Sequence, residues 1–381
     1  MTMPTMLDVA KRAGVALSTV SYALTGTRPV SAGTRQRILA AMEELGYHPN
    51  LMARSLSTKR SRILGLLIPS DMHGALNVMQ ANFVASAVRV ASSRSYGLLV
   101  WTLPEEEFDV RRMIQEGIVE GLVLMEVKLH DERVAKLRTS SYPFVLIGHC
   151  ADNTGISFVD FDFAAAQRLA VQHLVELGHT TIALSNFAEH ALAAGYGPAM
   201  RSTTGFQAAV AEFGVTGLTI SVPSQVEEAT AFVRRLLVEQ PQVTSLIVPD
   251  IARLSAVLQA AYQLELRIPD DFSVISVLDR DAAVRTAPPL TNIEFPPEEM
   301  GKIGAELLID RLEDPNAPAR QILLAAQLRR GQSTARPRDR ASRAPAPAAP
   351  AAANGAAPAA PMPGSASSAG SGTTVHQGEV A

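Results

Sequence analysis

The chain has 381 residues, enough for two or three domains, and 47% of them are apolar while 19% are charged, as in ordinary well-cored globular proteins. No apolar run is long enough to cross a membrane, no signal peptide is visible, and the single cysteine, Cys150, excludes an intrachain disulfide and a multi-cysteine metal site. We therefore expect a cytoplasmic protein in which Cys150 is a buried thiol.

The charge is divided unevenly along the chain. The net charge is −3, but residues 1–62 carry nine basic and three acidic side chains, which gives this segment +6 and leaves −9 on the remainder. A small basic segment joined to an acidic body predicts that the segment meets a polyanion and that the body does not. A solvated basic surface is the alternative that charge alone leaves open.

Residues 1–49 are predicted to form three short helices. The first covers "MLDVAKRA" and ends at Gly14, the second covers residues 17–25, and Ser31 caps a third that ends at Gly46. Two helices joined by a tight turn, with a third closing the core, form a helix-turn-helix domain. The outer face of the second helix is unusual, because it offers hydroxyl groups and no charge.

From residue 63 to residue 334 the pattern is that of an α/β body. Apolar runs of strand length alternate with amphipathic helical stretches such as "FAAAQRLAVQHLVELGH". Unalternated runs between helices indicate parallel strands buried on both faces, and about 270 residues is long for one sheet. We expect two doubly wound lobes with a ligand cleft between them at the strand ends. The runs are "ILGLLIP", "YGLLVW", "GLVLME", "FVLIGH", "GISFVDF", "TIALSN", "LTISVP", "SLIVPD" and "SVISVL".

Residues 335–381 are rich in Ala, Pro, Gly and Ser and have few large apolar residues to bury, so this segment is predicted to be a disordered tail. Motifs of common enzyme classes are absent from the sequence: there is no G-x-x-x-x-G-K phosphate loop, no G-x-S-x-G and no histidine cluster at metal-ligand spacing. We expect neither an enzyme nor a bound cofactor or metal ion.

Specific motifs occur in a fixed order along the chain. "LDVAKRAGVALSTVSYAL" is followed by "VSAGTRQRILAAMEELGYHPNLMARSL", and the body contains "HLVELGHTTIAL", "IPDDFSVISV" and "PPLTNIEFPPEEMGKIGAELLIDRL". Together they resemble the lactose-repressor (LacI/GalR) family of bacterial transcription factors, and the resemblance extends to about residue 334. It implies an all-α helix-turn-helix head and a two-lobed body like a periplasmic binding protein.

The resemblance implies that the outer face of residues 17–25 lies in the DNA major groove. Leu17, Ser18 and Tyr22 take the positions that read bases, while the neighbouring polar residues contact phosphates and position the helix. Ala16 departs from the family, which usually has Ser there, and this removes a cap worth about 1 kcal/mol. The implied DNA contacts of the head are Leu17, Ser18, Thr19, Ser21, Tyr22, Thr34 and Arg35.

The segment 50–62 resembles the family's hinge helix and linker, with "LMARSLS" as the helix and Asn50 as its cap. In the family this helix folds on operator DNA, where two copies meet in the minor groove. By resemblance Leu56 is the wedge that enters the central base step, and Ala53 allows close approach. Packing of Leu56 against the body is the alternative.

The body departs from the family at polar positions of the effector site. Ser202 stands where an Arg is frequent, Pro249 replaces a common Asn, and Leu278 replaces a sugar-binding Asp. Each polar partner lost from a buried site costs a polar ligand about 1–3 kcal/mol, which indicates an unusual effector or none. The candidate effector residues are Arg201, Ser202, Asp250 and Asp279.

These observations predict a dimeric regulator that binds a near-palindromic operator duplex and represses genes in response to a small carbohydrate-type effector. A regulator with a non-sugar ligand or no ligand is the first alternative. The second is a solute-binding sensor whose basic head is vestigial. The first two differ in whether sugars change DNA affinity, and the last predicts no specific DNA binding.

Overall fold

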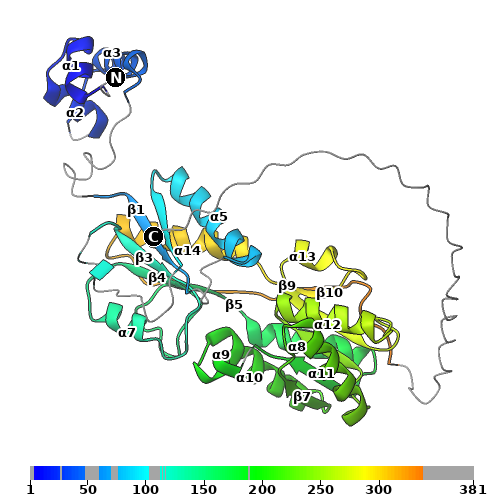
Figure 1. Ribbon diagram of the computed structural model, residues 1–381. Coiled ribbons are helices and arrows are strands. Elements are labelled where there is room, and N and C mark those ends of the chain that lie inside the picture. The colour runs from blue at the N-terminus through cyan, green and yellow to red at the C-terminus, as the bar shows by residue number, and fades with distance from the viewer. Residues whose placement is uncertain are drawn as a thin grey trace, which may run out of the picture. The chain divides into compact units, whose positions relative to one another are not determined.

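The computed structural model describes residues 4–25, 28–47, 60–69, 76–102, 112–113, 115, 117–187 and 189–337 (Figure 1). The predicted hinge helix lies outside these residues, as does the predicted tail apart from residues 335–337. The described part contains a three-helix head and an α/β body with two sheets, which confirms the predicted fold class.

The head consists of α1 (Met6–Ala13), α2 (Leu17–Thr25) and α3 (Ala32–Leu45), with the predicted limits. Thr5 and Asp8 form a reciprocal capping box at the start of α1. Gly14 and Gly46 end α1 and α3 in the left-handed conformation, which costs least for glycine. Val20 of α2 is completely buried in the small core of the head.

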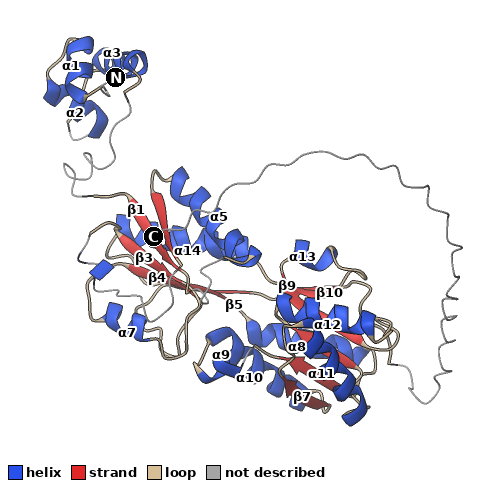
Figure 2. Ribbon diagram, viewed as in Figure 1, coloured by secondary structure: helices blue, strands red, loops and turns tan. Residues whose placement is uncertain are grey.

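The first lobe is built on a sheet of six parallel strands in the order β11-β5-β4-β3-β1-β2 (Figure 2). Successive residues of β1 enter two separate apolar clusters, so both faces of the sheet are covered. Helices α5 and α14 pack together on one face, and α7 covers the other. The elements are β1 (Ile63–Leu67), α5 (Val78–Ser93), β2 (Gly97–Trp101), β3 (Gly121–Leu124), α7 (Glu132–Arg138), β4 (Phe144–Ile147), β5 (Phe158–Phe161), α14 (Pro297–Glu313) and β11 (Gln321–Leu324).

The second lobe has a sheet in the order β12-β10-β9-β8-β6-β7, with only the short β12 antiparallel among these described strands. Helices α8 and α10 pack together, and α11 pairs with α12. The elements are α8 (Phe163–Glu176), β6 (Thr181–Ser185), α9 (Glu189–Ala193), α10 (Gly197–Glu212), β7 (Thr216–Ile220), α11 (Val226–Glu239), β8 (Ser245–Val248), α12 (Ile251–Gln263), β9 (Ser273–Leu278), α13 (Arg280–Val284), β10 (Thr291–Glu294) and β12 (Leu328–Arg329).

The chain passes between the lobes three times, after β5, after β10 and after β11. Aromatic rings gather at the first two crossings. The Phe161 ring meets Phe163 at 5.2 Å and Phe295 at 5.3 Å, both edge to face, and Phe83 of α5 meets Phe295 at 6.0 Å. These contacts join the two lobes through one continuous apolar cluster.

The last described residues are hydrogen-bonded into the second lobe. The carbonyl oxygen of Ala335 accepts from Nε2 of His179 at 3.0 Å, so the other ring nitrogen accepts from the Thr244 hydroxyl at 2.7 Å. Ser273 also bonds both backbone groups of Ala335. Ala335, where we expected the tail to begin, is therefore held by the body.

The buried ring of His179 predicts an acid-sensitive fold. Burial lowers its pKa from 6.5 to about 4, so between these values the unfolded chain binds more protons than the folded one. The free energy of unfolding should fall as the pH drops from 6.5 towards 4, by up to about 3 kcal/mol. Urea unfolding at pH 7 and pH 5 measures this loss.

A His179→Gln variant should be less stable at pH 7 but show a flatter dependence on pH. The matched control is His130→Gln, at an exposed histidine, which should keep the wild-type dependence. An unchanged pH dependence in His179→Gln would show that another group controls the acid sensitivity.

Candidate functional site

The face of α2 turned away from the head core carries the predicted DNA contacts. Val20 and Ala23 point into the core, whereas Leu17 is 46% exposed and Ser18 is exposed. Thr19, Ser21 and Tyr22 are partly exposed. The helix therefore presents hydroxyl, phenol and methyl groups to its surroundings, all of which can meet base edges or phosphates.

The start of α3 adds further groups to the head. Thr34 hydrogen-bonds to the capping residue Ser31 through its backbone and its hydroxyl, and Arg35 is exposed. Arg28 was not among the predicted contacts, and its guanidinium lies 5.2 Å from the centre of the Tyr22 ring. The available signal was a basic residue three positions after the end of the second helix. The remaining predicted DNA contacts, Asn50, Ala53 and Leu56, lie outside the described residues.

A cavity of about 600 Å³ lies between the two lobes, lined by residues from the strand ends of both. This is where two doubly wound sheets are expected to hold a ligand. Apolar and aromatic side chains make up most of the wall, and three carboxylates, Glu126, Asp160 and Asp250, also line it. We call it the cleft.

The cleft brings together only part of the predicted effector set. Asp250 lines it directly, while its carboxylate caps α12 by accepting from the Arg253 backbone at 2.8 Å. Ser202 is completely buried within α10 and does not line the cleft. Asp279 does not line it either, because its side chain accepts from the backbone of Ala282 and caps α13.

Arg201 reaches the cleft indirectly, through Asp160. Its guanidinium donates to the carbonyl of His149 at 2.5 Å and lies 3.6 Å from Oδ2 of Asp160, so it bridges α10 of the second lobe to the strand ends of the first. Nδ1 of His149 is 2.7 Å from the same oxygen. Burial lowers the pKa of Arg201 from its usual value, and the Asp160 charge opposes this.

Asp160 and His149 were not among the predicted effector residues. Asp160 is the third residue of β5 and His149 comes two residues after β4, near the edge where parallel sheets place their functional groups, and this was the available signal. Their pairing with Arg201 is a long-range contact that the sequence pattern alone does not reveal.

Backbone hydrogen bonds join the two lobes along one rim of the cleft. The amide of Leu129 donates to the carbonyl of Gly195 at 2.8 Å, and the amide of Gly197 donates to the carbonyl of Val127 at 3.0 Å. A side chain on Gly197 would overlap the Arg201 guanidinium and lie 2.9 Å from that carbonyl oxygen. The rim thus requires glycine where the lobes approach.

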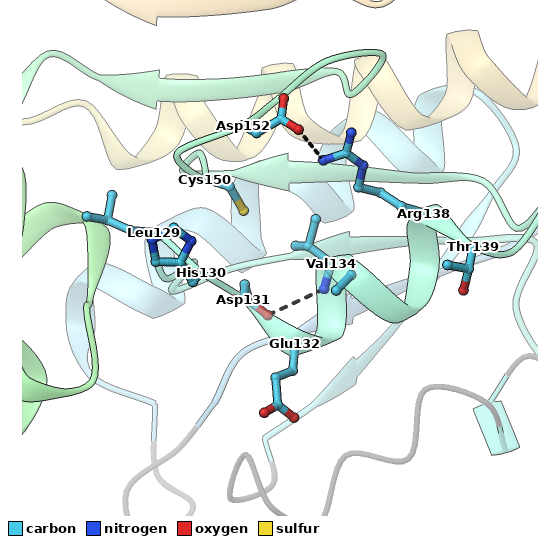
Figure 3. Close-up of a pocket in the computed structure, with 10 residues that line it drawn as sticks. Leu129, His130, Asp131, Glu132, Val134, Arg138, Thr139, Cys150 and Asp152 are labelled. Atoms are coloured by element: carbon cyan, nitrogen blue, oxygen red, sulfur yellow. Dashed lines mark hydrogen bonds and ion pairs between the residues drawn. The ribbon is translucent and has the colours of Figure 1, made fainter.

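A second cavity, of about 500 Å³, opens on the first lobe beside α7 (Figure 3). Cys150 projects towards it, and an ion pair of 2.8 Å between Arg138 and Asp152 lies at its edge. Cys150 is buried as predicted, and burial raises the pKa of its thiol to about 11, so it is a poor nucleophile at neutral pH. The cavity carries no catalytic arrangement.

Among the residues that the structure describes, no three His, Cys, Asp or Glu side chains come together as a set of metal ligands. None of the described helices has the length and apolar character needed to span a membrane.

Two family models match the chain. Residues 5–50 match "Bacterial regulatory proteins, lacI family", and residues 171–334 match "Periplasmic binding protein-like domain". The chain is also similar to the ribose operon repressor of Escherichia coli K12, with 28% identity over 329 residues that cover 84% of this chain and 97% of that protein. The repressor PurR of Photobacterium profundum is 27% identical over 322 residues, covering 82% and 93% of the two chains.

Solved structures share the fold. The Lac repressor dimer bound to operator and the anti-inducer ONPF has a TM-score of 0.73 at 23% identity, over 88% of this chain and all of that one. The complex of the regulator CelR with cellobiose has a TM-score of 0.62 at 24% identity, over 87% and 99%. The chain thus combines a lacI-type helix-turn-helix domain with a periplasmic-binding-protein-like domain and is similar along most of its length to transcriptional repressors with that organisation.

Proposed function

We propose that this protein is a dimeric, cytoplasmic repressor whose affinity for a near-palindromic operator changes when a small molecule occupies the cleft. The observation that carries the proposal is the exposed, uncharged face of α2 on a basic three-helix head. The related chains are named as repressors of transcription, which supports this function over catalysis. The partners are operator DNA, a second copy and the cleft ligand, and we expect no cofactor.

The head divides its contacts between bases and phosphates. We assign base contacts to Leu17, Ser18 and Tyr22, because a methyl group, a hydroxyl and a phenol on one exposed helix face suit the major groove. Arg28, stacked on Tyr22, brings a positive charge to the same face. The proposed phosphate contacts are Thr19, Ser21, Thr34 and Arg35.

The proposed hinge, residues 50–58, supplies the minor-groove contact. Asn50 caps the helix, Ala53 permits close approach and Leu56 is the wedge. Unstacking a base step costs a few kcal/mol, which the inserted apolar group and the resulting bend must offset. This assignment rests on the sequence, because the segment lies outside the described residues.

The effector acts in the cleft, where we propose that Asp250 and Arg201 respond to it. A carbohydrate is the first expectation, since relatives include a ribose operon repressor. Two observations favour a non-sugar ligand: Pro249 lines the cleft where the family commonly has Asn, and Leu278 is buried in the core of the second lobe. A sensor with a vestigial head would bind no operator.

Exchanging two residues of α2 tests the groove assignment. A variant with Leu17→Ser and Ser18→Leu should prefer a different half-site, because the methyl and hydroxyl groups that face the bases trade places. Arg35→Ala should instead weaken binding to all sequences alike, as the loss of a phosphate contact does. Selection of bound duplexes from a random pool measures both. Lys136→Ala, at an exposed lysine on α7 of the body, is the control.

Retention of the wild-type site preference by the exchanged variant would refute the assignment of α2 to base recognition. If the wild-type protein without added ligand binds all duplexes of the pool equally well, the proposed function itself is refuted.

Leu56→Ala should weaken operator binding at least tenfold, or by about 1.4 kcal/mol, and abolish DNA bending. Binding to random duplex at the same salt concentration should hardly change, because the basic residues remain. Titration of both duplexes, with a bending assay, measures this. Leu323→Ala, at a half-exposed leucine of the body, is the matched control. Equal losses on operator and random duplex would mean that Leu56 serves folding.

A further inference from the structure

We propose that the cleft binds a flat, largely apolar molecule, an aromatic compound of one or two rings with few polar groups, in place of a sugar. The inference rests on the proposed function, because it names the ligand class of the same cleft. Four features of the wall carry it: its aromatic and thioether groups, its internally bonded carboxylates, its polar helix cap and its one buried phenol.

The cleft wall is rich in rings and thioethers. Phe163 and Phe295 meet at 6.0 Å on the side of the chain crossings, and Phe187 and Tyr196 meet edge to face at 5.5 Å on the side of the second lobe. Aromatic edges and faces favour other rings, and sulfur of methionine makes favourable contacts with ring edges. The methionines that line the cleft are Met79, Met125 and Met300.

The carboxylate of Asp160 is bonded within the protein. Oδ1 accepts from the Phe161 amide at 2.8 Å, and Oδ2 lies 2.7 Å from Nδ1 of His149 and 3.6 Å from Arg201. The Asp160 side chain is 1% exposed. These partners use most of its acceptor sites, and its near-complete burial leaves little of the carboxylate open to a sugar hydroxyl.

Asp250 is engaged in the same way. Oδ1 accepts from the backbone of Arg253 at 2.8 Å, and Oδ2 lies 3.3 Å from the Arg253 guanidinium. Next to it Pro249 has no donor to offer. This part of the wall therefore offers a sugar few free partners, and each hydroxyl group buried without one would cost about 1–3 kcal/mol.

The polar residues of α5 are also committed. Asn77 and Gln80 satisfy one another in a capping box, and the Gln80 amide donates to Glu126 at 2.5 Å. Lys128 and His190 also line the cleft, but most of the lining residues are apolar or aromatic, and this composition suits an aromatic body.

Tyr196 provides a polar end. Burial, with the nearby negative charges of Glu126, Asp160 and Asp250, raises the pKa of its hydroxyl well above 10, so the group stays protonated at neutral pH. A protonated phenol can donate to an oxygen on the ring of the ligand. This geometry favours an aromatic compound with one acceptor group over an unsubstituted hydrocarbon.

Calorimetry on the full chain compares 2-naphthol with D-ribose, D-glucose and cellobiose. We expect 2-naphthol to bind at least tenfold more tightly than any of the three sugars, a difference of about 1.4 kcal/mol, and the sugars to have Kd values above about 1 mM. A sugar that binds as tightly as 2-naphthol overturns the proposal, and so does the absence of 2-naphthol binding.

Two variants distinguish the cleft from general surface adsorption. Met79→Lys places a charge in the wall and should weaken 2-naphthol binding at least tenfold, whereas Val238→Lys, at a 76% exposed residue of α11, should not change it. Tyr196→Phe, which keeps the ring, should weaken it severalfold. Equal effects of Met79→Lys and Val238→Lys overturn the proposal.

Operator titration of the same proteins without ligand separates this proposal from the proposed function. Specific operator binding combined with tight sugar binding would retain the repressor and refute the aromatic ligand. Tight 2-naphthol binding without specific binding to any operator would retain the aromatic ligand and refute the repressor function.

Discussion

The contact of Arg201 with the strand ends of the first lobe determines how the body is held together. The guanidinium leaves α10 in one lobe and meets the His149 carbonyl and the Asp160 carboxylate in the other. Charges removed from water need partners of opposite sign and good geometry. Separating the lobes would leave the Asp160 carboxylate with only His149 and the Phe161 amide as partners, so the shape of the cleft and the pairing of these charges change together.

The aromatic cluster at the chain crossings complements this polar contact. Phe161, Phe163 and Phe295 lie on segments that run from one lobe to the other, and their edge-to-face packing has a defined geometry. The same rings reach the cleft through Phe163 and Phe295. A ligand that contacts these rings therefore touches the segments that would have to bend if the lobes moved. Its binding can thus change the relative position of the two lobes.

Much of the fold follows from local pattern. The nine apolar runs became β1 to β9, and the three helices of the head end at the predicted glycines, because buried parallel strands and capped helices leave strong local signals. The strands β10, β11 and β12 were not predicted. They are two to four residues long, and β11 and β12 lie at sheet edges, where burial does not impose an apolar run.

The site was less accessible to sequence reasoning than the fold. Asp250 lines the cleft, since polar residues after a strand gather at the sheet edge, and its role in effector binding stays a prediction. Asp279 also follows a strand, but a helix begins there and its carboxylate is used as a cap. Ser202 faces the interior of its lobe. Which of the polar residues near strand ends faces the cleft depends on tertiary packing, and the local sequence pattern does not predict this.

The rim of the cleft has a consequence for how such a protein can diversify. Between Val127 and Leu129 on one side and Gly195 and Gly197 on the other, the lobes are joined by main-chain groups alone. Every amino acid except proline carries a backbone amide, so most substitutions at the partly exposed Leu129 leave its hydrogen bond to Gly195 intact, whereas the buried Val127 side chain is constrained by the core. Residues of the cleft wall can thus change, and with them the ligand, while the backbone hydrogen bonds at this rim are kept. Gly197 is the exception, because a side chain there would collide with Arg201.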